Sequence, residues 1–82
     1  MTDKDIIAVI RNELGRIAPE IDFEHADRRR PIHEEFDIDS MDFLNFITAL
    51  HARLGVNVPE ADYAKVATIA GAVTYLAEKT GA

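Results

Sequence analysis

Apolar residues recur at intervals of three and four in three stretches of this chain, and this spacing limits its fold more than any other feature. The stretches run from Asp3 to Ala18, from Asp39 or Ser40 to about Leu54, and from Thr68 to the end. Residues at this spacing share one face of a helix, and that face can be buried. Only residues 56–58 alternate as a strand does, so an all-α fold is predicted. The same periodicity predicts a core that contains Ile10, Leu14, Phe46, Ile47, Leu50, Val73 and Leu76.

Prolines and a capping residue separate the predicted helices. Pro19 ends the first helix, Pro59 suits the first turn of a short third helix through about Lys65, and Thr68 caps the last. Residues 19–39 form a long loop, in which a short turn of helix fits. Isolated apolar residues hold this loop to the core: Ile21, Phe23, Ile32 and Phe36. We therefore expect a four-helix bundle with three longer helices, one short third helix and a long first loop.

Length and composition favour a small cytoplasmic domain. Eighty-two residues suit a single domain, residues 1–82. The chain has no cysteine, which excludes disulfides and fits the cytoplasm. No run of apolar residues is long enough to cross a membrane. We expect a cytoplasmic monomer without a membrane span.

Negative charge is concentrated in one segment. The net charge is −6, from 15 acidic and 9 basic residues. Residues 20–42 hold nine acids and three arginines, Arg28 to Arg30, and nine minus three accounts for the whole excess. Nucleic acid is therefore a poor partner, because binding to phosphates needs a basic face. A basic protein surface is the expected partner.

Ser40 is the main candidate for chemistry, because it stands among acids at the start of the second predicted helix. A serine nucleophile needs an adjacent base and donors that stabilise an oxyanion. His51 could share this helix, but eleven residues separate it from Ser40, or about 16 Å. The chain also lacks the Gly-x-Ser-x-Gly turn of serine hydrolases. We therefore expect no enzyme activity and no catalytic residue.

Two groups of side chains come into question as metal ligands. The stretch from His33 to Glu35 lacks a second histidine four residues along, which a helix would need to present two ligands. Asp37, Asp39 and Asp42 are spaced somewhat like a calcium loop, but its glycine and its distal glutamate are missing. Solvated charge is predicted for both groups, and no metal site.

Two interpretations of Ser40 remain open from its sequence context. Serine is favoured as a helix N-cap, a role that needs no further function. Alternatively, another enzyme attaches a phosphate-containing group to its hydroxyl. The free backbone N–H groups and the helix dipole would favour that group by about 0.3–1 kcal/mol. Attachment explains better why acids surround a serine that must stay exposed.

The residues around Ser40 resemble the signature of acyl carrier proteins. Asp39-Ser40-Met41 is similar to the family's Asp-Ser-Leu, whose serine bears 4'-phosphopantetheine. Residues 56–60 (VNVPE) resemble the family's Ile-Pro-Asp/Glu entry to a short helix, and residues 64–69 lead similarly into the last helix. The order and spacing over about forty residues are specific. The first helix and the acidic loop match in length and character only.

The resemblance implies a carrier. A phosphopantetheinyl transferase would move the arm from coenzyme A to Ser40 with Mg²⁺, and Asp39 would contribute to recognition by the transferase. The terminal thiol of the arm would hold an acyl group as a thioester, which suits a chain without cysteine. The carrier would deliver this group to acyl-loading and acyl-using enzymes of a fatty acid, lipid or polyketide-type pathway. The predicted partner-binding residues are Met41, Asp42, Leu44, Asn45, Thr48, His51, Glu60 and Asp62.

The chain departs from the family pattern in three places. Asp37 stands where the family commonly has glycine, and Asn45 and His51 replace glutamates on the exposed side of the second helix. Phe43 and Phe46 are bulkier than the usual residues. These departures predict a specialised, free-standing carrier whose partner docks through basic or apolar patches.

Two alternatives to an acyl carrier stay open. The first is an aminoacyl or peptidyl carrier. The second, from another class, is an unmodified helical adaptor with the same fold. An adaptor would have no reason to keep Asp39 and Ser40.

Overall fold

The computed structural model describes residues 2–81 and confirms the predicted all-α fold. Six helical segments follow one another along the chain: α1 (Asp3–Ile17), η1 (Phe23–His25), α2 (Ile32–Glu35), α3 (Ser40–Leu54), η2 (Glu60–Val66) and α4 (Ile69–Thr80). Segments η1 and η2 are 3₁₀ helices. Within the described residues the only β-type pairing is an isolated bridge between Pro31 and Thr68. The four-helix bundle therefore consists of α1, α3, the short η2 and α4.

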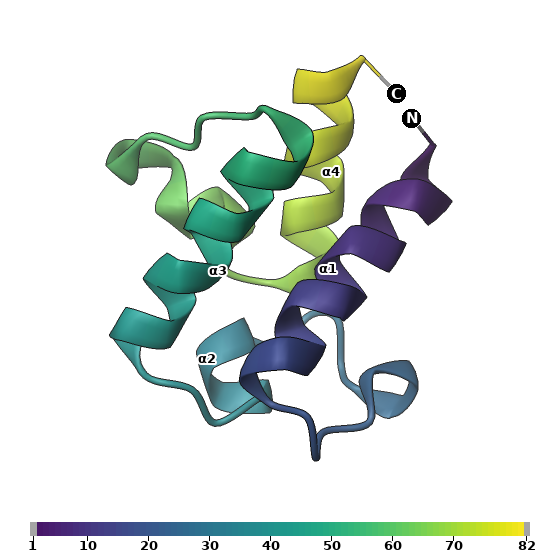
Figure 1. The fold of residues 1–82 in the computed structure, drawn as a ribbon, viewed down its shortest axis with the longest axis vertical. Helices are drawn as coiled ribbons and strands as arrows, with labels where there is room; N and C mark the ends of the chain where they lie inside the picture. The colour runs from purple at the N-terminus through teal and green to yellow at the C-terminus, as the bar shows by residue number, and fades with distance from the viewer. Residues whose placement is uncertain (1, 82) are drawn as a thin grey trace.

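The three longer helices pack around one shared interior (Figure 1). Helix α1 contacts both α3 and α4, and η2 packs against α4. α1 runs antiparallel to both α3 and α4, so the end of α1 and the start of α3 lie at the same end of the molecule. Helix α2 lies at that end as well and contacts α3.

Local capping sets the helix boundaries. Thr2 and Asp5 form a reciprocal capping box at the start of α1. The side chain of Thr68 accepts a hydrogen bond from the Gly71 amide and caps α4, as predicted. Helix α3 ends at Gly55, whose φ of 69° lies in the left-handed region that glycine enters without a steric penalty.

The long loop is held in place by its apolar side chains and by two short helices. Phe23, Ile32 and Phe36 are buried, as predicted, whereas Ile21 is half-buried. The backbone N–H of Ile32 donates to the carbonyl oxygen of Ala67 at 2.7 Å. The loop is thereby fixed to the junction between η2 and α4, far away in the sequence.

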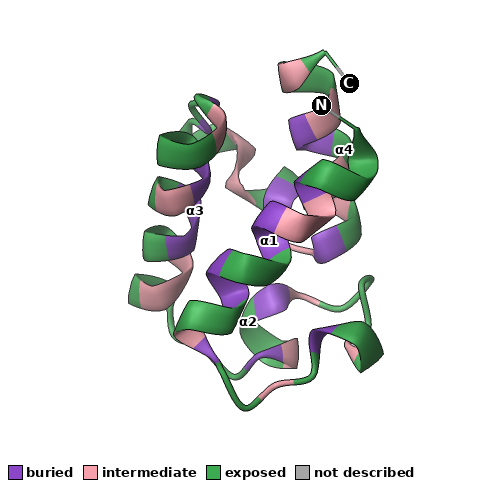
Figure 2. Cartoon of the chain, turned by 45° about the vertical axis from the view of Figure 1, so that its right-hand side comes forward, coloured by how far each residue is buried: buried purple, intermediate pink, exposed green. Residues whose placement is uncertain are grey.

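The core contains six of the seven residues expected from periodicity. Ile10, Leu14, Phe46, Ile47, Leu50 and Leu76 are buried. The prediction for Val73 is wrong, because Val73 is only half-buried and packs at the margin of the core. Helix α4 turns Ala72 and Tyr75 inward instead, since it packs against η2 as well as α1. The buried faces of the helices point at one another (Figure 2).

One buried charge was not predicted from the sequence. Glu13 is only 4% exposed, because it lies among the core positions of α1. Its carboxylate accepts a hydrogen bond from the Arg53 guanidinium at 3.1 Å. This ion pair joins α1 to the end of α3, and burial without a partner would be costly for the carboxylate.

Candidate functional site

Ser40 is the first residue of α3, and its side chain is exposed. The residue before it caps the helix: the Asp39 side chain accepts a hydrogen bond from the Asp42 amide at 2.8 Å. The interpretation of Ser40 as the N-cap is therefore wrong. Because the Asp39 side chain caps the helix, the Ser40 hydroxyl is not needed for capping and faces solvent.

The start of α3 also offers backbone donors. The first backbone hydrogen bond of the helix runs from the Phe43 amide to the Asp39 carbonyl oxygen, at 3.0 Å. The amides of Ser40 and Met41 precede it, and such amides have no partner within a helix. A phosphate on the Ser40 oxygen fits this position, because these N–H groups and the helix dipole favour negative charge.

The turn before Ser40 has an unusual backbone. Asp37 has a φ of 51°, the only positive φ among the described residues other than glycine. This is the position at which the resemblance expects glycine. Asp37 adopts the left-handed conformation, although it has a side chain.

The outward side of α3 is continuous and carries no carboxylate. Met41 is 65% exposed and Leu44 is 42% exposed. Asn45, Thr48 and His51 are exposed beside them. The Thr48 hydroxyl donates to the Leu44 carbonyl oxygen at 3.0 Å, within its own helix. The structure thus brings these five predicted partner-binding residues together on one face.

The three acidic members of the predicted partner set lie elsewhere. Asp42 is half-buried and turned toward the end of α1, where it lines a pocket. Glu60 is exposed at the start of η2. The carboxylate of Asp62 accepts a hydrogen bond from the Tyr75 hydroxyl at 2.8 Å, which lowers the pKa of Asp62 and raises that of Tyr75. Lys65 lies 3.5 Å from the same carboxylate.

An aromatic pair links α3 to η2. The ring centroids of Phe43 and Phe46 lie 6.2 Å apart, and those of Phe43 and Tyr63 lie 6.4 Å apart in an edge-on arrangement. Such tilted and edge-on pairs add stability beyond the area that they bury. Phe43 therefore packs against the third helix through Tyr63, whereas Phe46 is buried in the core.

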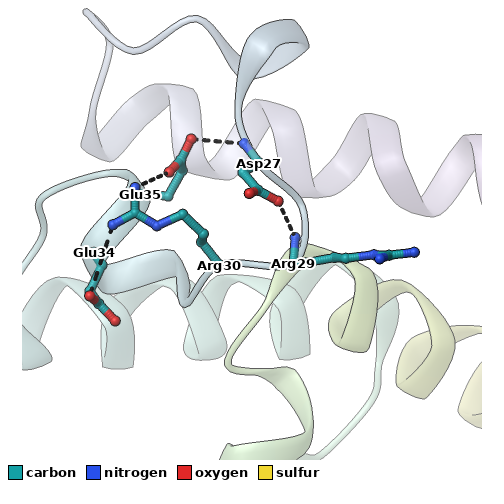
Figure 3. A network of polar contacts seen from close by, with 5 residues as sticks. All are labelled: Asp27, Arg29, Arg30, Glu34 and Glu35. Carbon is teal, nitrogen blue, oxygen red and sulfur yellow. Dashed lines mark hydrogen bonds and ion pairs between the residues drawn. The ribbon is translucent and has the colours of Figure 1, made fainter.

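A basic residue of the loop neutralises the acids near α2 (Figure 3). The Arg30 guanidinium lies 3.2 Å from a Glu35 oxygen and 3.9 Å from a Glu34 oxygen. Glu35 also accepts a hydrogen bond from the Asp27 amide at 2.8 Å, and Asp27 accepts one from the Arg29 amide at 2.9 Å. Of the three consecutive arginines, Arg30 therefore balances the charge of acids within the folded chain.

The acids around η1 are paired as well. The Arg11 guanidinium lies 3.1 Å from a Glu24 oxygen. His25 hydrogen-bonds to Asp22, which raises the pKa of His25 and lowers that of Asp22.

The acids nearest Ser40 are not paired in this way. Within residues 2–81, Glu20, Asp37, Asp39 and Asp42 form no ion pair with a basic side chain. Four acids without an ion pair therefore lie close together around the start of α3.

Other kinds of site find no support in the described part of the chain. Between Thr2 and Gly81, no three histidine, aspartate or glutamate side chains are grouped so that they could hold a metal ion. In the same residues, no helix is long and apolar enough to span a membrane.

Comparison with known proteins supplies the family. A family model described as "Phosphopantetheine attachment site" matches residues 4–76. The fold is similar to a solution structure described as that of an acyl carrier protein from Anaplasma phagocytophilum, with a TM-score of 0.81. The two sequences are 22% identical, and the match covers 98% of this chain and 93% of the other.

The family match includes α1, the acidic loop, α3, η2 and most of α4, and therefore nearly the whole chain. The structural similarity independently supports the fold. This chain belongs to the phosphopantetheine attachment family: it is a carrier domain, the kind of domain to which 4'-phosphopantetheine is attached covalently and which has no catalytic activity of its own, and its fold is that of an acyl carrier protein.

Proposed function

We propose that Ser40 is the residue to which the 4'-phosphopantetheine arm is attached. One observation carries the assignment: Asp39 caps α3 and leaves the Ser40 hydroxyl exposed at the helix start. The amides of Ser40 and Met41 would receive a phosphate oxygen, while the side chain stays clear of the core. Asp39 would also take part in recognition by the transferase.

Attachment requires a transferase, coenzyme A and Mg²⁺. The Ser40 oxygen forms a bond to the phosphorus next to the pantetheine, and the bond from that phosphorus to the bridging oxygen of coenzyme A breaks. The hydroxyl proton is lost to a base, and adenosine 3',5'-bisphosphate leaves. The described hydrogen bonds include none between a carboxylate and Ser40, and the transferase is proposed to supply the base.

The cargo is proposed to be an acyl group, held as a thioester on the terminal thiol of the arm and delivered to enzymes of a fatty acid, lipid or polyketide-type pathway. The absence of cysteine supports a thiol supplied by the arm. An aminoacyl or peptidyl cargo uses the same attachment chemistry. We also propose that residues 1–82 act as a single cytoplasmic domain and as a monomer. Light scattering on the purified protein would measure the oligomeric state.

Intact-mass measurement tests the assignment. Incubation with coenzyme A, Mg²⁺ and a broad-specificity phosphopantetheinyl transferase should add the mass of one arm, and Ser40→Ala should remove the gain completely. Thr74→Ala is the matched control, because Thr74 is an exposed hydroxyl residue on α4. A folded wild-type chain that several transferases leave unmodified would favour the unmodified adaptor.

The outer face of α3 is proposed to dock the partner enzymes. Met41 and Leu44 supply apolar contact area, and Asn45, Thr48 and His51 surround it without a carboxylate. Asp42 and Glu60 would add charge at its margins, whereas the Asp62 carboxylate is engaged with Tyr75. Docking should therefore depend less on salt than in a carrier whose second helix has glutamates on its exposed side, and it should favour a dedicated partner.

A gain-of-function variant tests this face. If the missing charges limit general partners, Asn45→Glu with His51→Glu should improve loading by an acyl-loading enzyme of general fatty acid synthesis. The same two charges added on α4, by Thr74→Glu with Ala70→Glu, are the control for net charge, since both residues are exposed. Loading of the wild type at the rate of that system's own carrier would refute the specialised role.

A further inference from the structure

The turn between α2 and α3 is closed by two backbone hydrogen bonds. The Phe36 amide donates to the Ile32 carbonyl oxygen at 2.9 Å and ends α2. The Ile38 amide reaches back over Asp37 to the His33 carbonyl oxygen at 3.1 Å. This second bond is typical of a helix that ends on one left-handed residue, and Asp37, with its φ of 51°, is that residue. The backbone of Asp37 therefore determines how the chain leaves α2.

The side chains on both sides of Asp37 are buried, although Asp37 itself is exposed. Phe36 is 3% exposed and Ile38 is 8% exposed. Both line a small pocket beside Ser40, together with Ile17 at the end of α1. Rotation of the Asp37 backbone to a negative φ would withdraw a buried side chain or break the hydrogen bond of the Ile38 amide. The core therefore holds this turn in its left-handed conformation.

The turn leads directly into the attachment site. Ile38 is followed by Asp39, whose side chain caps α3 by accepting a hydrogen bond from the Asp42 amide at 2.8 Å. Ser40 is the next residue and the first of α3. The backbone of Ser40 is thus held by the turn before it and by the helix after it. The direction in which its hydroxyl points therefore depends on the backbone of Asp37.

We propose that Asp37 is a positioning residue for the modification of Ser40, and that it acts through its left-handed backbone and not through its charge. The Asp37 carboxylate forms no ion pair within residues 2–81, which leaves the backbone as the part of this residue that shapes the turn. Transfer to phosphorus requires the attacking oxygen to lie in line with the oxygen that leaves, so a displaced hydroxyl reacts more slowly. The inference rests on the proposed attachment at Ser40 and adds what orients its hydroxyl.

Variants at position 37 separate the backbone from the charge. Asp37→Asn loses the charge but tolerates the left-handed conformation, whereas Asp37→Glu keeps the charge and resists that conformation. With a broad-specificity transferase at saturating coenzyme A, kcat for Asp37→Asn should stay within about twofold of the wild type. For Asp37→Glu, kcat should fall about fivefold while KM changes by less than about twofold. Asp37→Gly should match Asp37→Asn, because glycine enters the left-handed region without a steric penalty.

Hydrogen exchange of the Ile38 amide reports the turn independently of the transferase. Its protection, relative to the core amides of α3, should persist in Asp37→Asn and fall in Asp37→Glu, since its bond to His33 depends on the turn. Ile6→Val is the control for lost stability and should change neither kcat nor this relative protection. Ile6 is fully buried near the start of α1, which lies at the opposite end of the bundle from the start of α3 (Figure 1).

Asp37→Ala repeats the test if Asp37→Glu does not fold, because alanine also resists the left-handed backbone. A kcat that falls in Asp37→Asn and not in Asp37→Glu would overturn the proposal, because the charge would then be what acts. Equal kcat values in all the variants, an equal fall in Ile6→Val, or a fall while the Ile38 amide stays protected would overturn it as well. Failure of the wild-type chain to accept the arm is a different result, because it removes the attachment at Ser40 itself.

Discussion

Asp37 has a small conformational cost and lies shortly before Ser40, the proposed attachment residue. Its φ of 51° is the only positive value outside glycine among residues 2–81. L-residues pay about 1–2 kcal/mol in this region, less for aspartate and asparagine and nothing for glycine. The residue also adds one of the unpaired negative charges near Ser40.

Substitution at Asp37 should therefore follow backbone preference. We expect the free energy of unfolding to rank Asp37→Gly above Asp37→Asn, and both above Asp37→Ala. Glycine should exceed alanine by about 1 kcal/mol, because alanine resists the left-handed conformation. Urea unfolding measures the order. An alanine variant as stable as the glycine variant would show that the turn relaxes to a negative φ.

Leu50 and Leu44 provide a matched test of the core. Leu50 is fully buried on α3, whereas Leu44 is exposed on the same helix. Leu50→Ala should cost about 2–5 kcal/mol of stability, and Leu44→Ala less than about 0.5 kcal/mol. Denaturant unfolding of both variants checks the helix phase. Losses of similar size would contradict the assigned buried face.

At the scale of the elements, the sequence predicted those features that depend on nearby residues. The cap at Thr68 and the start of α3 at Asp39 or Ser40 each involve residues within four positions. Apolar periodicity likewise placed α1, α3 and most of their buried side chains. Ser40 could be singled out because its signature is local too.

The remaining features depend on contacts between distant residues. Helix α2 begins at Ile32, whose amide bonds to Ala67, and Glu13 is satisfied by Arg53. Neither partner is visible in a local pattern. The pocket beside Ser40 also combines the end of α1 with the turn before α3, so spacing alone could not reveal it.

Gly71 allows the close approach of α4 to η2. A Cβ atom at this position would lie 2.5 Å from the Lys65 carbonyl oxygen, which is too close for any side chain. Gly71→Ala should therefore force the two elements apart and cost about 1–3 kcal/mol. Gly15→Ala on α1 is the control: a Cβ there meets nothing within 4 Å, and alanine should stabilise the helix by about 0.5–1 kcal/mol. The midpoint temperature of thermal unfolding should thus fall in Gly71→Ala and rise in Gly15→Ala.

The hydrogen bond from Tyr75 to Asp62 makes the junction of η2 and α4 sensitive to acid. A carboxyl group whose pKa is lowered on folding stabilises the fold above its unfolded pKa, about 4, and loses this effect as the pH falls through the folded value. In Tyr75→Phe the pKa of Asp62 should return toward its ordinary value, as carboxyl NMR titration would measure.

The wild type should accordingly lose more stability than Tyr75→Phe as the pH falls below about 4. Tyr63→Phe is the control, because the Tyr63 ring packs against Phe43. An unchanged Asp62 pKa in Tyr75→Phe would assign the shift to the nearby Lys65 instead.

At the scale of the whole molecule, the uneven charge predicts a response to salt. The unpaired acids around the start of α3 repel one another in a protein of net charge −6. Raising the ionic strength from about 0.01 M to about 0.1 M shortens the Debye length from ~30 to ~10 Å, so the melting temperature should rise.

Neutralising an unpaired acid should reduce this rise. Asp37→Asn is expected to do so, whereas Glu24→Gln removes a carboxylate that Arg11 already balances. Differential scanning calorimetry at several salt concentrations measures both. A melting temperature that falls steadily with added salt would contradict the predicted repulsion.

The antiparallel arrangement of α1 with α4 has a further consequence for protein engineering. The start of α1 and the end of α4 lie together, at the opposite end of the bundle from the start of α3 (Figure 1). A fusion partner, a surface anchor or a fluorescent label joined through Asp3 or Thr80 would leave the serine end uncovered. Several copies of the domain could be joined through short linkers at this end, and the Ser40 end of each copy would stay free of the linker.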